Sequence, residues 1–188
     1  SLAITTGSSS SGASGDLSML AGDAEVGNGG AVQISAGSSS AGVGGSIQVS
    51  TGVGHSTGSG SLELFSSDVL VAGDSGSAYL ATGSSPQGSS GSLSLATGRS
   101  TASPSGTVAI SSGASTSAAS GDLVLSSGYA IASDSGSVSM ASGRARRGDS
   151  GSTAVITGDA YSGTTGSVLL QTGTATNGVA GGVTVQVG

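Results

Sequence analysis

Aliphatic side chains alternate with small polar residues in short segments that recur with a 15-residue period along the chain. If a recurring glycine is taken as position 1, aliphatic residues fill position 3 in most repeats and position 5 in all of them. Position 5 holds Ile4, Met19, Ile34, Val49, Leu64, Leu80, Leu95, Ile110, Leu125, Met140, Val155, Leu170 and Val185. A two-residue alternation of this kind predicts one half-buried strand of about six residues per repeat.

Two glycines frame each predicted strand. Position 1 is Gly15, Gly30, Gly45, Gly60, Gly76, Gly91, Gly106, Gly121, Gly136, Gly151, Gly166 and Gly181, and position 8 is glycine in every complete repeat but one. The exception is Ser67, in the single 16-residue repeat at 60–75. Glycine at this frequency disfavours a helix, and it predicts tight corners with positive φ at both strand ends.

The strands cannot bury their aliphatic face one at a time, so the repeats must stack. The sequence therefore predicts an all-β fold: a single-stranded β-solenoid of about 13 flattened coils with parallel sheets, in which each 15-residue repeat forms one coil. Residues 1–188 would form one repeat domain, and since neither end offers a polar cap, we expect a segment of a longer array. An antiparallel hairpin sandwich is the rival, but it requires two kinds of turn where all connections look alike.

Composition removes several classes of function. The chain has no Cys, Trp or Lys, 2% aromatic and 7% charged residues, and a net charge of −6. These values exclude a disulfide scaffold and a cysteine metal site, and they disfavour nucleic-acid binding. No apolar run is long enough for a membrane span, and no cofactor or resident metal is expected.

Few residues point to chemistry. Residues 54–58 match the G-x-S-x-G pattern of a nucleophile elbow, but the only histidine, His55, adjoins the candidate Ser56 and no helix follows. Asp134 and Asp149 share position 14 in neighbouring repeats, where solvated carboxylates are the simpler interpretation than a weak cation site. The basic cluster at 144–147 is interpreted as a solvated edge. The chain is therefore predicted not to be an enzyme.

The irregular repeat at 60–75 is the most apolar of the set. It is interpreted as a bulge whose loop folds over the rod, with a docking knob as the alternative.

Positions 4 and 6 point outward if positions 3 and 5 point inward. Across all repeats, Glu63 is the only charged residue at these two positions. A flat, exposed, uncharged surface of short side chains indicates a partner. The candidate face comprises Gln33, Ser35, Gln48, Ser50, Ser94, Ala96, Ala109, Ser111, Val124, Ser126, Ser139, Ala141, Ala154 and Ile156.

In composition and predicted architecture the whole chain resembles the β-solenoid ice-binding (antifreeze) proteins, and similar Gly/Ser-rich arrays of algal and bacterial surface proteins. The resemblance implies an extracellular or cell-surface protein that binds ice or ordered water through the face at positions 4 and 6. The chain departs from the outward Thr-x-Thr ladders of that family, because its threonines gather at position 7, as at Thr51, Thr82 and Thr97.

Two other functions compete with ice binding. A structural segment of an extracellular filament, cell wall or adhesin stalk would use regularity only for stacking, and its partners would be further copies of the repeat. A carbohydrate-processing β-helix would need grouped acids and aromatic platforms, whereas Phe65, Tyr79, Tyr129 and Tyr161 lie far apart in sequence.

Overall fold

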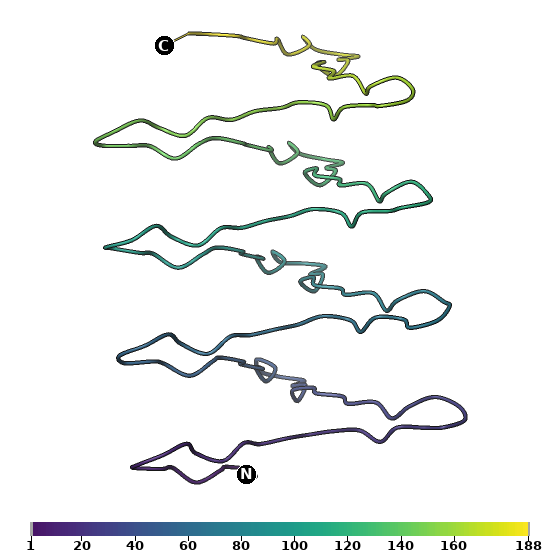
Figure 1. Ribbon diagram of the computed structural model, residues 1–188. Helices are drawn as coiled ribbons and strands as arrows, with labels where there is room; N and C mark the ends of the chain where they lie inside the picture. Colours follow the sequence, from purple (N-terminus) through teal and green to yellow (C-terminus); the bar gives the residue numbers. More distant parts are fainter. Residues whose placement is uncertain (1, 188) are drawn as a thin grey trace. The chain divides into compact units, whose positions relative to one another are not determined.

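Extended segments joined by bends make up the whole of the chain that the structure describes. The computed structural model describes residues 2–187, and within this range there is neither a helix nor a strand. The chain turns back on itself at each bend, as Figure 1 shows. It separates into two units, Ser1–Ser94 (unit 1) and Leu95–Gly188 (unit 2).

The bends recur with the period of the sequence. Unit 1 contains bends at 10–12, 25–27, 40–42, 55–57, 70–73 and 86–88, and unit 2 contains bends at 101–103, 116–118, 131–133, 146–148, 161–163 and 176–178. Each bend begins at position 11 of its repeat. In the 16-residue repeat the bend is longer by one residue, so the extra residue is absorbed there and the next repeat starts in phase. The 15-residue sequence repeat is therefore also the repeat of the backbone.

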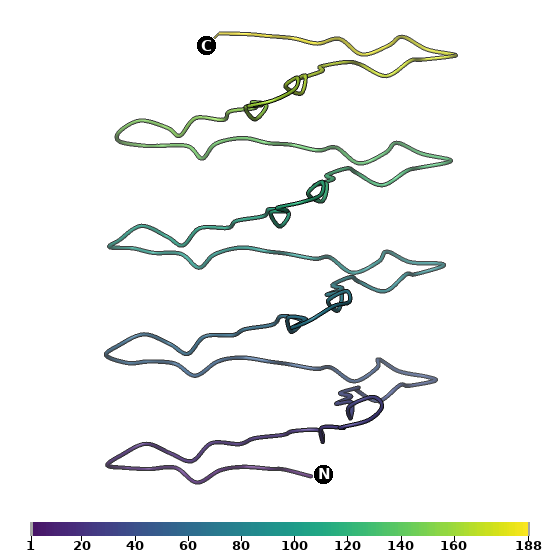
Figure 2. The ribbon, with the colours of Figure 1, turned by 45° about the vertical axis from the view of Figure 1, so that its right-hand side comes forward.

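In most repeats the two ends of the loop approach each other closely, at a point that we call the pinch. The Gly30 N–H donates a hydrogen bond to the Gly22 carbonyl at 2.9 Å, and Gly45 and Gly60 make the same bond to Gly37 and Gly52 at 2.8 and 3.2 Å. Each of these bonds joins position 1 to position 8 of the preceding repeat. Figure 2, turned from the first view, shows the same out-and-back path.

The predicted β-solenoid with parallel sheets is wrong for the described residues, and so is any β-helix. A parallel sheet requires a ladder of backbone bonds between strands one repeat apart, whereas the backbone bonds in residues 2–187 join the ends of a single loop. A single backbone hydrogen bond at a pinch fixes one point of contact. It does not fix the register of the residues on either side of that point. The outgoing and returning segments therefore form no antiparallel sheet either.

The glycines at positions 1 and 8 do not have the positive φ that their places in the sequence predicted. Positive φ values occur instead inside the bends, at Gly27 (101°), Gly148 (93°) and Gly163 (118°) at position 13, and at Gly73 (129°) in the longer bend. Position 1 is constrained by space at the pinch: a Cβ on Gly30 would lie 3.1 Å from the Ala21 Cβ and 3.2 Å from the Gly22 nitrogen.

Serine at position 10 organises a second kind of bend. In each repeat that has serine there, its Oγ accepts a hydrogen bond from the backbone N–H three residues later. The pairs are Ser9 with Gly12 (3.1 Å), Ser39 with Gly42 (2.9 Å), Ser85 with Gly88 (3.0 Å), Ser100 with Ser103 (3.3 Å) and Ser115 with Ala118 (3.2 Å). The bends with positive φ have alanine or valine at position 10 instead. Small residues at this position thus serve the bend itself, not the close approach of two coils.

No described residue is buried, so the predicted interior does not form. Leu95 and Ile110, expected to face inward, are 67% and 70% exposed. The total accessible surface is 18678 Å², against about 7,800 Å² for a folded monomer of this mass and about 25,000 Å² for its unfolded chain. The alternation survives only as partial shielding, since Val108 at position 3 is 52% exposed and Val124 at position 4 is 80% exposed.

Candidate functional site

The predicted face at positions 4 and 6 lies on the segments between bends, and all of its residues are exposed. Five of them, from Gln33 to Ser94, belong to unit 1, and the nine from Ala96 to Ile156 belong to unit 2. No sheet among residues 2–187 aligns them in a plane. Their role as a binding face stays a prediction.

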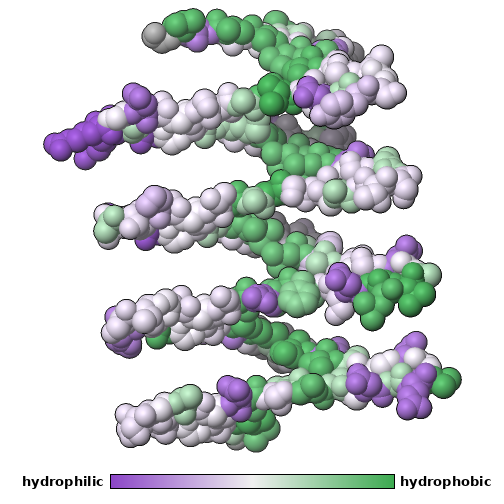
Figure 3. All heavy atoms as spheres, in the orientation of Figure 1, coloured by the Kyte–Doolittle hydropathy of each residue, from purple (hydrophilic) through white to green (hydrophobic). Residues whose placement is uncertain are grey.

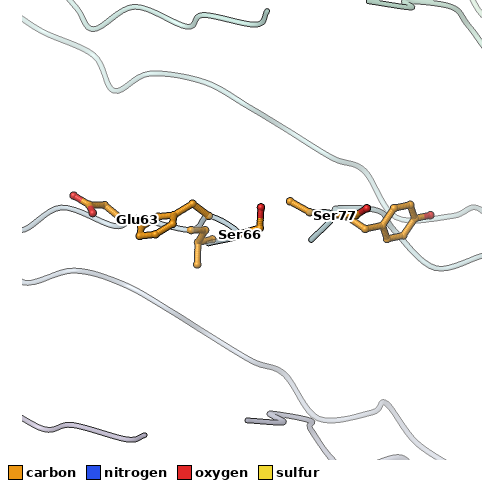
Figure 4. Close-up of a pocket in the computed structure, with 7 residues that line it drawn as sticks. Glu63, Ser66 and Ser77 are labelled. Carbon is orange, nitrogen blue, oxygen red and sulfur yellow. The ribbon is translucent and has the colours of Figure 1, made fainter. Parts of the chain in front are cut away.

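A groove of about 500 Å³ lies at the irregular repeat, in unit 1. One wall is formed by residues 63–66, which precede bend 70–73, and the other by residues 77–79, which follow it. The lining residues are Glu63, Leu64, Phe65, Ser66, Ser77, Ala78 and Tyr79. In the close-up of Figure 4, Ser66 and Ser77 lie in the middle of the groove and Glu63 lies toward one end.

The pinch of this repeat lies beside the groove, because Ser66 belongs to both. A Cβ built on Gly76 would lie 3.6 Å from the Ser66 Cβ, so position 1 is again close to position 7 of the preceding repeat. Because the extra residue is taken up by the bend, the pinch keeps the pairing found in ordinary repeats. The two walls leave the pinch in different directions, and the space between them is the groove.

The groove brings together the unusual residues of positions 4 and 6. Glu63 and Phe65 occupy positions 4 and 6 of one repeat, and Tyr79 occupies position 4 of the next. Glu63 is the only charged residue at these positions, and the two rings are half of the aromatic residues in the chain. Phe65 and Tyr79 are 78% and 90% exposed, so their faces are open to a ligand.

Sequence reasoning missed this site because it treated the aromatic residues as dispersed. Phe65 and Tyr79 lie on the two extended segments that bend 70–73 joins, and both residues line the groove. The signal was present in the sequence: Glu63, Phe65 and Tyr79 are large or charged side chains at positions 4 and 6 that flank one bend, and this bend belongs to the only 16-residue repeat.

The lining combines groups that can bind a cation. Ser66 and Ser77 are the nucleophilic side chains, and neither has an imidazole in the lining, because the single histidine, His55, lies on bend 55–57. A carboxylate, two hydroxyls and two aromatic faces suit a planar cation such as a guanidinium.

The part of the chain that the structure describes has neither a metal cluster nor a membrane-spanning helix. Residues 2–187 contain no group of three or more His, Asp or Glu side chains arranged to hold a metal ion. This range also offers no helix with the length and apolarity for a bilayer crossing.

A basic bend in unit 2 is the second site with distinctive chemistry. Arg146 and Arg147 lie on bend 146–148, and Arg144 lies two residues before it. All three side chains are exposed, and Gly148 closes the bend with its positive φ. Figure 3 shows strongly hydrophilic residues gathered at the tip of this bend, at the left of the view.

No protein-family model, no curated protein and no solved structure matches this chain.

Proposed function

We propose that this chain is a non-enzymatic structural repeat protein, of the kind that builds an extracellular filament, wall or stalk, and that further copies of the repeat cover its apolar positions. The observation that carries the proposal is the exposure of those positions. Every large aliphatic residue that the structure describes is at least 45% exposed, the least exposed being Val69.

The constant spacing of these apolar positions indicates which kind of partner can cover them. Leu, Ile, Val and Met recur at position 5 with a constant spacing, and the bends keep the same period. A partner with the same period can match many such positions at once, and a second copy of the repeat has that period by construction. Burial of apolar surface then supplies the driving force that the single chain lacks.

Sedimentation analysis over a wide range of concentrations tests the proposal. The wild-type chain is expected to associate, and Leu95→Ser, Ile110→Ser and Leu125→Ser together are expected to weaken the association strongly, because they remove apolar side chains from position 5.

A matched control changes apolar residues that belong neither to position 5 nor to the candidate face. Ile131→Ser, Leu169→Ser and Val179→Ser lie in the same unit and are more exposed in the free chain. The control variant should associate like the wild type. A wild-type chain that stays monomeric at every concentration contradicts the proposal.

Ice binding is a second candidate, supported by the resemblance in composition and by the exposure of the small, uncharged residues at positions 4 and 6. It requires these residues to order water on a common surface. An ice-recrystallisation assay on the purified chain tests it, with Ser94→Tyr and Ala109→Tyr as variants that should abolish the activity. Absence of any effect of the wild-type chain on ice removes this candidate.

A further inference from the structure

Charge is divided unequally between the two units. Unit 1 holds six carboxylates and no lysine or arginine, so its formal charge is −6. Unit 2 holds four carboxylates and all four arginines, so its formal charge is 0, and the two values sum to the −6 of the chain. The acidic residues of unit 1 are Asp16, Asp23, Glu25, Glu63, Asp68 and Asp74.

The irregular repeat concentrates the acidic and aromatic groups of unit 1. Glu63 lines the groove with Phe65 and Tyr79, while Asp68 and Asp74 flank bend 70–73, between the two walls in sequence. This is the chemistry that binds a guanidinium, which stacks on aromatic faces and donates its N–H groups to carboxylates and hydroxyls.

The basic bend of unit 2 carries the complementary groups. It presents Arg144, Arg146 and Arg147, all exposed on or beside the bend. A bend is a narrow projection, and the groove is an open concavity between two extended segments. The two sites therefore carry opposite charges, although Asp149 directly follows the basic bend.

We infer that the groove formed by Glu63, Phe65 and Tyr79 binds the Arg144–Arg147 bend of a second copy of this chain. The inference rests on the proposed function, the association of copies of this chain, and adds a polar contact to the apolar one at position 5. Because the two sites differ, the contact is heterologous: each bound pair of copies leaves one free groove and one free basic bend. Copies can therefore add head to tail, into an open chain of molecules or into a ring if the geometry closes.

The test uses two full-length variants, each defective in one site. In the groove variant Glu63→Gln is combined with Phe65→Ser, and in the bend variant Arg144, Arg146 and Arg147 are changed to Gln, so that the two altered sites carry no charge that could attract one another. Each variant alone should lose head-to-tail growth in sedimentation velocity, with about a tenfold or greater loss of apparent affinity.

Mixing the two variants gives the sharpest result. The intact basic bend of the groove variant can bind the intact groove of the bend variant. The two sites that remain free in this pair, one groove and one bend, are both mutated and cannot bind a further copy. The mixture should therefore form dimers and nothing longer by this contact, whereas the wild type forms longer species. Added salt should weaken the wild-type contact, because its charged groups are exposed.

Matched controls change charge elsewhere. Asp16→Asn in unit 1 and Arg99→Gln in unit 2 lie outside both sites and should leave association unchanged. If the wild type associates and both site variants associate equally well, the inference is overturned while the proposed function stands. If the bend variant alters only the sedimentation of the monomer, the contact lies within one chain and the inference is again overturned. A wild type that never associates overturns both.

Discussion

Single residues decide how each repeat turns back. A serine hydroxyl at position 10 accepts the N–H of position 13 in one set of bends, and glycine with positive φ occupies the bend in another. Both devices are local, because neither needs a contact from another repeat. Nine of the twelve bends in residues 2–187 have one of these devices, so those bends form although no core holds them; bends 55–57, 131–133 and 176–178 have neither.

Ser115→Ala removes the hydrogen bond from the Ala118 N–H to the Ser115 Oγ. An exposed hydrogen bond of this kind contributes about 0.5–1 kcal/mol, so amide exchange at Ala118 should become roughly two- to fivefold faster. Ser117→Ala, in the same bend, is the control and should leave that rate unchanged. Equal rates in both variants would show that the hydroxyl does not hold the bend.

Gly163→Ala and Gly158→Ala form a matched pair. A Cβ meets no atom within 4 Å at either site, but only Gly163 has a positive φ, of 118°. The strain on an L-residue there is about 1–2 kcal/mol, so Gly163→Ala should lower the population of bend 161–163 by roughly tenfold. The NMR shifts of residues 161–163 report the change, and Gly158→Ala should not move them. A response of the same size to both substitutions would contradict the assigned φ.

At the scale of the element, the described residues have a pinch between two extended segments where the sequence predicted paired strands. Position 1 glycine approaches position 7 of the preceding repeat, and in unit 1 three such approaches carry a backbone bond. The irregular repeat keeps its pinch because its longer bend absorbs the extra residue, and the groove beside Glu63 and Tyr79 follows from that.

Gly30→Ala should open a pinch. Its new Cβ would lie 3.1–3.3 Å from Ala21 and Gly22 atoms, whereas a Cβ at Gly121 would lie 3.8 Å from the Ser112 Cβ, an ordinary contact. Nuclear Overhauser effects between residues 21 and 30 should weaken in Gly30→Ala, and those between residues 112 and 121 should persist in Gly121→Ala. Retention of the first set would mean that the two segments approach less closely than described.

The elements also show what the sequence could predict. The 15-residue period, the irregular repeat at 60–75 and the alternation at positions 3 to 6 are local patterns, and the structure keeps the first two as bends. The parallel stack required each backbone N–H group to bond to the same strand one repeat away. Alternation of apolar and polar residues alone does not identify the bonding partner of an N–H group. The aromatic groove required knowing that residues 65 and 79 lie across one bend, which follows from the turn-back and not from composition.

For the whole molecule, the accessible surface area shows how little apolar burial stabilises a single copy. At 18678 Å² the chain exposes about three quarters of what its unfolded form would expose. A single copy therefore gains little from apolar burial, and its regular aliphatic positions remain available to other copies. The uneven charge of the two units gives that association a direction.

Small-angle X-ray scattering on the dilute chain should report an expanded particle. A folded 188-residue domain has a radius of gyration of about 16 Å, and an unfolded chain of that length about 46 Å. The value for the monomer should lie well above the folded figure, because no core draws the repeats together. A radius of gyration equal to that of a folded domain would contradict the exposure described for the aliphatic residues.

Amide hydrogen exchange along the whole chain, measured on the dilute monomer, tests most directly whether the repeats lack a shared ladder and core. We predict near-intrinsic exchange at the aliphatic positions of every repeat, with modest slowing confined to donors such as Gly30 and Ala118, which have local partners. Strong, cooperative protection of the amides around Leu95, Ile110 and Leu125, recurring with the period of the sequence, would contradict it.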